Sequence, residues 1–172
     1  MVRETAGTSG MSAARRPAAR PQAGRHEAVR RSSLGVCAAL LVQYALGLWL
    51  NTYVTVPARD QGGGIFAAAG RALANGPAAL AVHAGLGLLL LLGSIVLVVR
   101  AAADRSGFFV VTSVVSLLAV LGAAATGAAF VSSGRDSASL AMGLLTAVAL
   151  LCQVLNLFRL GARTAAAERP GR

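Results

Sequence analysis

Few residues within the apolar segments of this 172-residue chain carry groups that can do chemistry. The most versatile is His83, because a neutral imidazole can bind a metal ion and can carry a proton. Met142 offers a thioether that can ligate iron, although a methionine in an apolar helix is by default a packing residue. The remaining candidates carry amide or hydroxyl groups and are Gln43, Asn51, Thr126, Gln153 and Asn156.

These residues form no known catalytic or metal-binding pattern. The apolar segments contain no Asp, Glu, Lys or Arg, so carboxylate pairs and Ser/His/Asp sets have no candidates there. The loop Gly62-Gly63-Gly64 lacks the following Lys and the strand context of a phosphate-binding loop. Cys37 and Cys152 are too few for a disulfide framework and lack metal-ligand spacing. We therefore expect no catalytic residues, no metal site and no enzymatic activity.

Four apolar segments dominate the chain and cover residues 34–56, 77–99, 108–131 and 138–158. Each reaches the roughly 20 residues that cross a hydrocarbon core about 30 Å thick. Within lipid such segments must be helices, because only helices satisfy their own backbone hydrogen bonds. The composition agrees, with 56% hydrophobic residues, 13% charged residues and a mean hydropathy of +0.67. The predicted fold is all-α, an integral membrane four-helix bundle of antiparallel up-down topology.

The segments outside these spans are predicted to be tails and loops. Residues 1–33 are rich in Ala, Gly, Pro and Arg without apolar periodicity, which predicts a disordered basic tail. Residues 159–172 form a second basic tail. In the loop after the first span, the Ala-rich stretch from Ile65 to Ala74 suits a short interfacial helix. The other two connections are short, which favours antiparallel neighbours.

The distribution of arginine predicts the orientation. Thirteen of the 16 arginines lie before the first span, between the second and third spans, or after the fourth, and only Arg59, Arg71 and Arg135 lie on the other side. Positive residues favour the cytoplasmic side, so both termini are expected there.

This arrangement also argues against nucleic acid as a partner of the basic chain. All basic residues are Arg and none is Lys, as is typical of GC-rich bacterial genomes, which indicates the bacterial plasma membrane.

The polar residues of the spans fall into two expected layers when they are counted from the helix ends. The outer layer contains Asn51, His83, Thr126 and Met142. The inner layer contains Ser113, Ser116, Gln153 and Asn156, and Gln43 lies near the middle of the first span. The simplest role for such groups is hydrogen bonding across helices, worth about 0.6 kcal/mol on average.

The stretch Leu41-Val42-Gln43-Tyr44-Ala45-Leu46-Gly47, followed by Ala81-Val82-His83-Ala84, resembles half of a heme A synthase. That family pairs two four-helix halves, and histidines of its second and fourth helices hold heme near the outer face. The resemblance implies heme binding by His83. The fourth span has no histidine, which leaves Met142, or His83 of a second copy, as the other ligand. The family's acidic catalytic residue has no counterpart in the spans, which implies a relative without catalysis.

Three functions are compatible with these observations. The expected one is a non-enzymatic membrane protein that acts through helix packing or partner binding, with lipid, a second copy or another membrane protein as partner. The alternative is a heme-binding or redox-associated protein that uses His83. The third is a small oligomeric transporter, for which the spans lack the carboxylate that proton coupling ordinarily needs.

Overall fold

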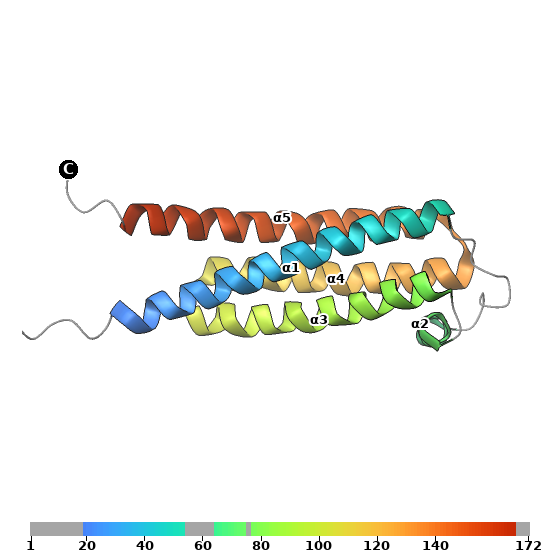
Figure 1. Ribbon diagram of the computed structural model, residues 1–172, viewed down its shortest axis with the longest axis horizontal. Helices are drawn as coiled ribbons and strands as arrows, with labels where there is room; N and C mark the ends of the chain where they lie inside the picture. The colour runs from blue at the N-terminus through green and yellow to red at the C-terminus, as the bar shows by residue number, and fades with distance from the viewer. Residues whose placement is uncertain (1–18, 54–63, 75–76, 168–172) are drawn as a thin grey trace, which may run out of the picture.

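The computed structural model describes residues 19–53, 64–74 and 77–167, and their regular structure is entirely helical. Helix α1 (Ala19–Tyr53) is followed by the short α2 (Ile65–Ala74) and then by three long helices. These are α3 (Ala78–Asp104), α4 (Gly107–Ser133) and α5 (Asp136–Ala167). The four long helices form an antiparallel bundle in which α1 packs on α3 and α5, and α4 packs on the same two helices (Figure 1). The all-α prediction is confirmed.

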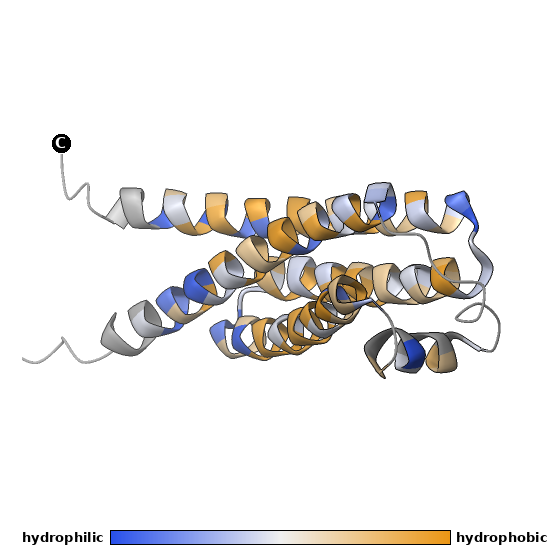
Figure 2. Ribbon diagram, turned by 45° about the vertical axis from the view of Figure 1, so that its right-hand side comes forward, coloured by the Kyte–Doolittle hydropathy of each residue, from blue (hydrophilic) through white to orange (hydrophobic). Residues whose placement is uncertain are grey.

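The two ends of the bundle differ in charge. One end contains the start of α1, the α3–α4 turn and the end of α5, and is termed the arginine-rich end (Figure 1). The arginines of this end whose side chains are described are Arg25, Arg30, Arg31, Arg100, Arg105, Arg159 and Arg163. The opposite end, termed the α2 end, has α2 packed against α3 and α4 and has Arg71 and Arg135 among its described residues. Hydrophobic residues line the long helices between the two ends (Figure 2).

Left-handed residues close α3 and α4 and make the short connections possible. Arg105 has φ 58° and its N–H donates to the carbonyl oxygen of Ala102 at 3.1 Å. Gly134 has φ 64° and its N–H donates to the carbonyl oxygen of Phe130 at 2.7 Å. A residue in this conformation commonly ends a helix, and glycine adopts it without steric cost. The next helix then returns antiparallel, as the short connections predicted.

Four of these helices are long and apolar enough to cross a membrane, over residues 24–53, 78–104, 107–133 and 136–163. This confirms the four apolar helices predicted from the sequence. The short α2 confirms the helix predicted for Ile65 to Ala74. Residues 57–63 and 75–76 of the predicted first loop lie outside the described residues.

The outer face of the bundle is apolar, unlike that of a water-soluble protein, and its apolar core also contains polar side chains. Among its most exposed large side chains are Leu89, Leu92, Leu118, Leu144 and Phe158. Among its most buried side chains are Ser33, Ser94, Ser113, Ser116, Gln153 and Asn156. A soluble helix buries its apolar stripe and exposes its polar face. The apolar outer face is therefore suited to contact with lipid.

Helix α1 begins well before the first predicted span. Residues 19–33, which the sequence predicted to be disordered, are helical, whereas residues 1–18 lie outside the described part of the chain. The reason is a buried stripe at helical spacing that continues backwards from Leu40 and Val36 through Ser33 to Val29. Helix α5 likewise continues through residues 159–167 of the predicted second tail.

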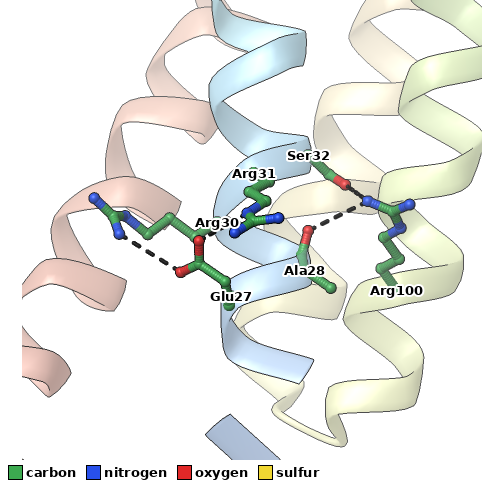
Figure 3. A network of polar contacts seen from close by, with 6 residues as sticks. All are labelled: Glu27, Ala28, Arg30, Arg31, Ser32 and Arg100. Carbon is green, nitrogen blue, oxygen red and sulfur yellow. Dashed lines mark hydrogen bonds and ion pairs between the residues drawn. The ribbon is translucent and has the colours of Figure 1, made fainter. Parts of the chain in front are cut away.

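The early part of α1 is attached to α3 by a set of contacts termed the latch. His26 Nδ1 lies 2.5 Å from Asp104 Oδ1, and the Asp104 side chain is 2% exposed. Arg25 donates to the carbonyl oxygen of Ala103 at 3.1 Å. Arg100, reaching back from α3, donates to the carbonyl oxygen of Ala28 and to Ser32 Oγ (Figure 3). Hydrogen bonds to charged groups are roughly twice as strong as neutral ones, so the latch holds this stretch of α1 in place.

A second charged group on α1 lies at the surface and stays within the helix. Glu27 accepts from Arg31 Nε at 2.9 Å and lies 3.5 Å from Arg30 Nη1 (Figure 3). Exposed pairs of this kind contribute little to stability. Glu27 is therefore a matched control for Asp104.

We predict that Asp104→Ala releases the first described turns of α1. Loss of a charged hydrogen bond worth about 1.5–3 kcal/mol should speed backbone hydrogen exchange over residues 24–31 by roughly tenfold or more. Glu27→Ala should leave these rates within about twofold of the wild type. Hydrogen exchange measured by mass spectrometry in lipid nanodiscs tests both. Equal effects of the two substitutions would contradict the latch.

Candidate functional site

The polar residues predicted from the sequence lie in two separate contacts between helices. The first joins α1 to α3, and its four residues are termed the α1–α3 clasp: Gln43, Gly47, His83 and Gly87. The second joins α4 to α5, and its four residues are termed the α4–α5 seam: Thr112, Ser116, Gln153 and Asn156. The polar side chains of the seam carry hydroxyl and amide groups. Those of the clasp carry one amide and one imidazole.

Each helix of the clasp contributes one polar side chain and, four residues later, one glycine. This spacing puts Gln43 and Gly47 on one face of α1, and His83 and Gly87 on one face of α3. Because the helices are antiparallel, His83 lies over Gly47 while Gln43 lies over Gly87. A β-carbon at Gly47 would stand 3.1 Å from His83 Cε1, and one at Gly87 would stand 3.3 Å from Gln43 Nε2. The two glycines thus provide the space that both polar side chains occupy.

The clasp is held by the amide of Gln43. Its Nε2 donates to the carbonyl oxygen of His83 at 2.9 Å and lies 3.3 Å from the ring Nε2 of His83. An amide donor at the ring Nε2 requires that nitrogen to accept, which puts the imidazole proton on Nδ1. His83 Nδ1 and Gln43 Oε1 are buried without a hydrogen-bond partner among the described residues. The imidazole of His83 is therefore engaged with α1 on one side.

Two side-chain hydrogen bonds join α4 to α5 in the seam. Thr112 Oγ1 donates to Asn156 Oδ1 at 2.5 Å, and Gln153 Nε2 donates to Ser116 Oγ at 2.8 Å. Gln153 and Asn156 are one turn apart on α5 and both are fully buried. Three of the four residues expected in the inner layer, namely Ser116, Gln153 and Asn156, thus belong to bonded pairs, and Thr112, which the sequence analysis did not single out, completes them. Ser113, the fourth expected member, is also buried on α4, but its hydroxyl is in neither pair.

The expected outer layer is divided among different neighbours. Asn51 Oδ1 accepts from Ser139 Oγ at 3.2 Å, which ties α1 to α5. Thr126 donates to the carbonyl oxygens of Gly122 and Ala123 within its own helix. Met142 packs on Gly127, where a β-carbon would stand 3.1 Å from its sulfur. These residues share a level but form no common polar cluster.

The contacts of His83 and Met142 also describe the surroundings of the two predicted heme ligands. His83 belongs to the contact between α1 and α3, and Met142 belongs to the contact between α4 and α5, on the opposite side of the bundle. None of the contacts described for either residue joins them. The ring Nε2 of His83 lies against Gln43, and the sulfur of Met142 lies against Gly127. Heme binding by His83, with Met142 or a second copy's His83 as the other ligand, stays a prediction.

Sequence reasoning missed two contacts at the arginine-rich end. The first is the His26–Asp104 pair of the latch, which joins residues 78 positions apart. The second pairs the arginines of α5 with the first turn of α4. The guanidinium carbon of Arg159 lies 4.5 Å from the ring centroid of Phe108, and that of Arg163 lies 4.9 Å from the centroid of Phe109. The sequence did contain a signal for the second contact, because Arg159 and Arg163 are four residues apart and therefore share one face of α5.

Comparison with protein-family models, with curated proteins and with solved structures finds no match for this chain. Within the described residues, no three His, Cys, Asp or Glu side chains are grouped as metal ligands.

We predict that Gly47→Ala and Gly35→Ala have different effects on stability. Gly35 is exposed with nothing within 4 Å of an added β-carbon, so alanine there should gain up to about 1 kcal/mol of helix propensity. At Gly47 the ring of His83 is held by Gln43, and crowding it should cost about 1–3 kcal/mol. Unfolding in detergent mixtures, followed by circular dichroism, measures both.

The His83→Ala background provides the control for this comparison. Removal of the imidazole should make Gly47→Ala as favourable as Gly35→Ala, because the crowded group is gone. If Gly47→Ala stayed more destabilising than Gly35→Ala in that background, contact with His83 would not be the cause.

Proposed function

We propose that this chain is a multi-pass protein of the bacterial plasma membrane, with both termini in the cytoplasm, that acts by binding rather than by catalysis. The observation that carries the proposal is the apolar outer face of the bundle. Side chains such as Leu92 and Leu118 face outward at 60% and 61% exposure, whereas Gln153 and Asn156 are fully buried. Water would penalise such a surface, and lipid does not.

The charge distribution supports the orientation. Except for Arg135, the arginines described as exposed lie at the arginine-rich end, which carries both the first turns of α1 and the last turns of α5 (Figure 1). Each arginine near an anionic leaflet contributes about 1 kcal/mol of attraction. A cytoplasmic position of this end follows the positive-inside rule and gives anionic lipid headgroups as its first partner.

The polar groups of the spans support binding rather than chemistry. Gln43, His83, Gln153 and Asn156 each contact a neighbouring helix. These contacts commit part of the hydrogen-bonding capacity of each group to helix packing. The outer face is apolar, so a protein partner would have to be embedded in the membrane, either as a second copy or as another chain.

We predict the topology from this proposal. In a background of Cys37→Ala and Cys152→Ala, the isosteric changes Ser106→Cys and Ser137→Cys each place one thiol at opposite ends of the bundle. A membrane-impermeant maleimide should modify Ser137→Cys in intact cells and Ser106→Cys only after permeabilisation. The reverse pattern would contradict the orientation, and labelling of both in intact cells would contradict the spans.

A single purification tests the function. We expect native mass spectrometry of the full chain to show bound anionic lipid, a second copy or a membrane protein partner. The double change Arg30→Gln/Arg31→Gln should reduce bound anionic lipid, whereas Arg135→Gln at the α2 end should not. A bare monomer under all conditions would contradict the proposal.

The same sample decides the heme alternative. Absorption spectra of the oxidised and dithionite-reduced protein, beside His83→Ala, are expected to be featureless and alike. A Soret band that is lost in His83→Ala would instead establish His83 as a heme ligand and replace the binding proposal by a redox-associated one.

A further inference from the structure

Besides Asp104 Oδ2 of the latch, four buried polar atoms in the arginine-rich half of the bundle have no hydrogen-bond partner among the residues that the structure describes. They are Ser33 Oγ on α1, Ser113 Oγ on α4, and Gln153 Oε1 and Asn156 Nδ2 on α5. Their side chains are only 0–1% exposed. Buried polar atoms in proteins nearly always have a partner, so four such atoms in one part of a bundle require one.

The atom on α1 lies at the same level as those on α5. Asn51 and Ser139 are hydrogen-bonded and fix the relative position of these antiparallel helices. Ser33 is 18 residues from Asn51, and Asn156 is 17 residues from Ser139. At 1.5 Å per residue these separations are about 27 and 26 Å, so Ser33 and Asn156 lie at one level.

The atom on α4 lies at this level too. Ser113 directly follows Thr112, whose hydroxyl donates to Asn156. Gln153 is one turn away from Asn156 on the same buried face of α5, bonded to Ser116. Three of the four long helices thus direct a fully buried polar side chain to one layer of the core, termed the orphan layer: Ser33, Ser113, Gln153 and Asn156.

The chemistry of the orphan layer determines which ligand suits it. The two hydroxyls can each donate and accept, one amide presents an oxygen, and the other presents an NH2 group. Each amide uses one of its two polar atoms on α4, so either orientation leaves the other atom for the layer. A ligand must therefore both donate and accept hydrogen bonds. Water does so and is the smallest molecule that can.

A metal cation suits the layer less well. The apolar segments contain no Asp or Glu that would balance its charge in a medium of low dielectric constant. An amide NH2 group would also face the cation rather than coordinate it. Neutral hydrogen-bonding groups without a counter-charge are the usual lining of a buried water site.

We propose that Ser33, Ser113, Gln153 and Asn156 form an internal water-binding site that links α1 to the α4–α5 pair. The proposal depends on the bundle alone and is independent of the binding function proposed above. Bound water here supplies hydrogen bonds that the direct contacts of the seam leave unmade. At this level the direct polar contacts described for α1 go to α3. The bound water adds a polar connection from α1 to α4 and α5.

Water next to a side-chain amide can be detected by nuclear magnetic resonance. The chain has only seven Asn and Gln residues, so the side-chain amides of Gln153 and Asn156 can be assigned by substitution. In the full chain in lipid nanodiscs, rotating-frame transfer from water should reach both amides, with the sign that distinguishes proximity from proton exchange. Absence of this transfer in the wild type would overturn the proposal without any variant.

Serine substitutions provide the matched comparison. Ser33→Ala/Ser113→Ala removes two partners of the water and should reduce the transfer to Asn156 at least twofold. Ser94→Ala is the control, because Ser94 is equally buried but its hydroxyl donates to the carbonyl oxygen of Leu90 within α3. Unchanged transfer in the double variant, or an equal loss in Ser94→Ala, would contradict the site. If the double variant does not fold, the two single variants make the same comparison.

A salt exchange separates water from a cation. Replacement of sodium chloride by choline chloride should leave the amide signals of Gln153 and Asn156 unshifted. A shift confined to these two amides would overturn the water site in favour of a sodium site.

Discussion

The need to satisfy polar groups inside a bundle with an apolar exterior governs the arrangement of this protein. A polar side chain that faces lipid has no water to replace its hydrogen bonds, so it must find a partner on another helix or within its own. The polar residues of the spans do both. Thr126 and Ser94 donate back to their own helices, whereas Gln43, Gln153 and Asn156 reach across to neighbours. Each cross-helix bond fixes the register of one helix pair.

The two helix pairs solve this problem with different chemistry. In the α1–α3 clasp, glycines bring the helices close enough for Gln43 to reach the carbonyl oxygen of His83. In the α4–α5 seam, side chains bond to each other, and glycines further along, at Gly122 and Gly127, accept apolar side chains instead. Because each interhelical bond is worth only about 0.6 kcal/mol on average, close packing supplies most of the cohesion and the bonds select the register.

The sequence predicted those features of the structure that depend on one segment alone, and it did not predict those that depend on packing between distant segments. Four apolar runs predicted four helices because the length and composition of a span are properties of one segment. The start of α1 was misplaced because Arg and Ala hide the stripe that Val29 and Ser33 continue. The pairs of the candidate site depended on register between distant segments. Depth grouped His83 with Met142, and packing shows that their described contacts lie in different helix pairs, α1–α3 and α4–α5. His26 had been assigned to a tail without structure, so its contact with Asp104 had no sequence signal.

Helix α1 also has a mechanical consequence, since it continues unbroken over 35 residues, or about 52 Å. It touches α3 near its beginning at His26 and again at Gln43, and it touches α5 near its far end at Asn51. A continuous helix is stiff on this scale, and Leu40 is buried near its middle. Release of the arm at the arginine-rich end would tilt the whole rod and move the arm at the α2 end the other way. Movement at one end of the bundle would in this way be carried to the other.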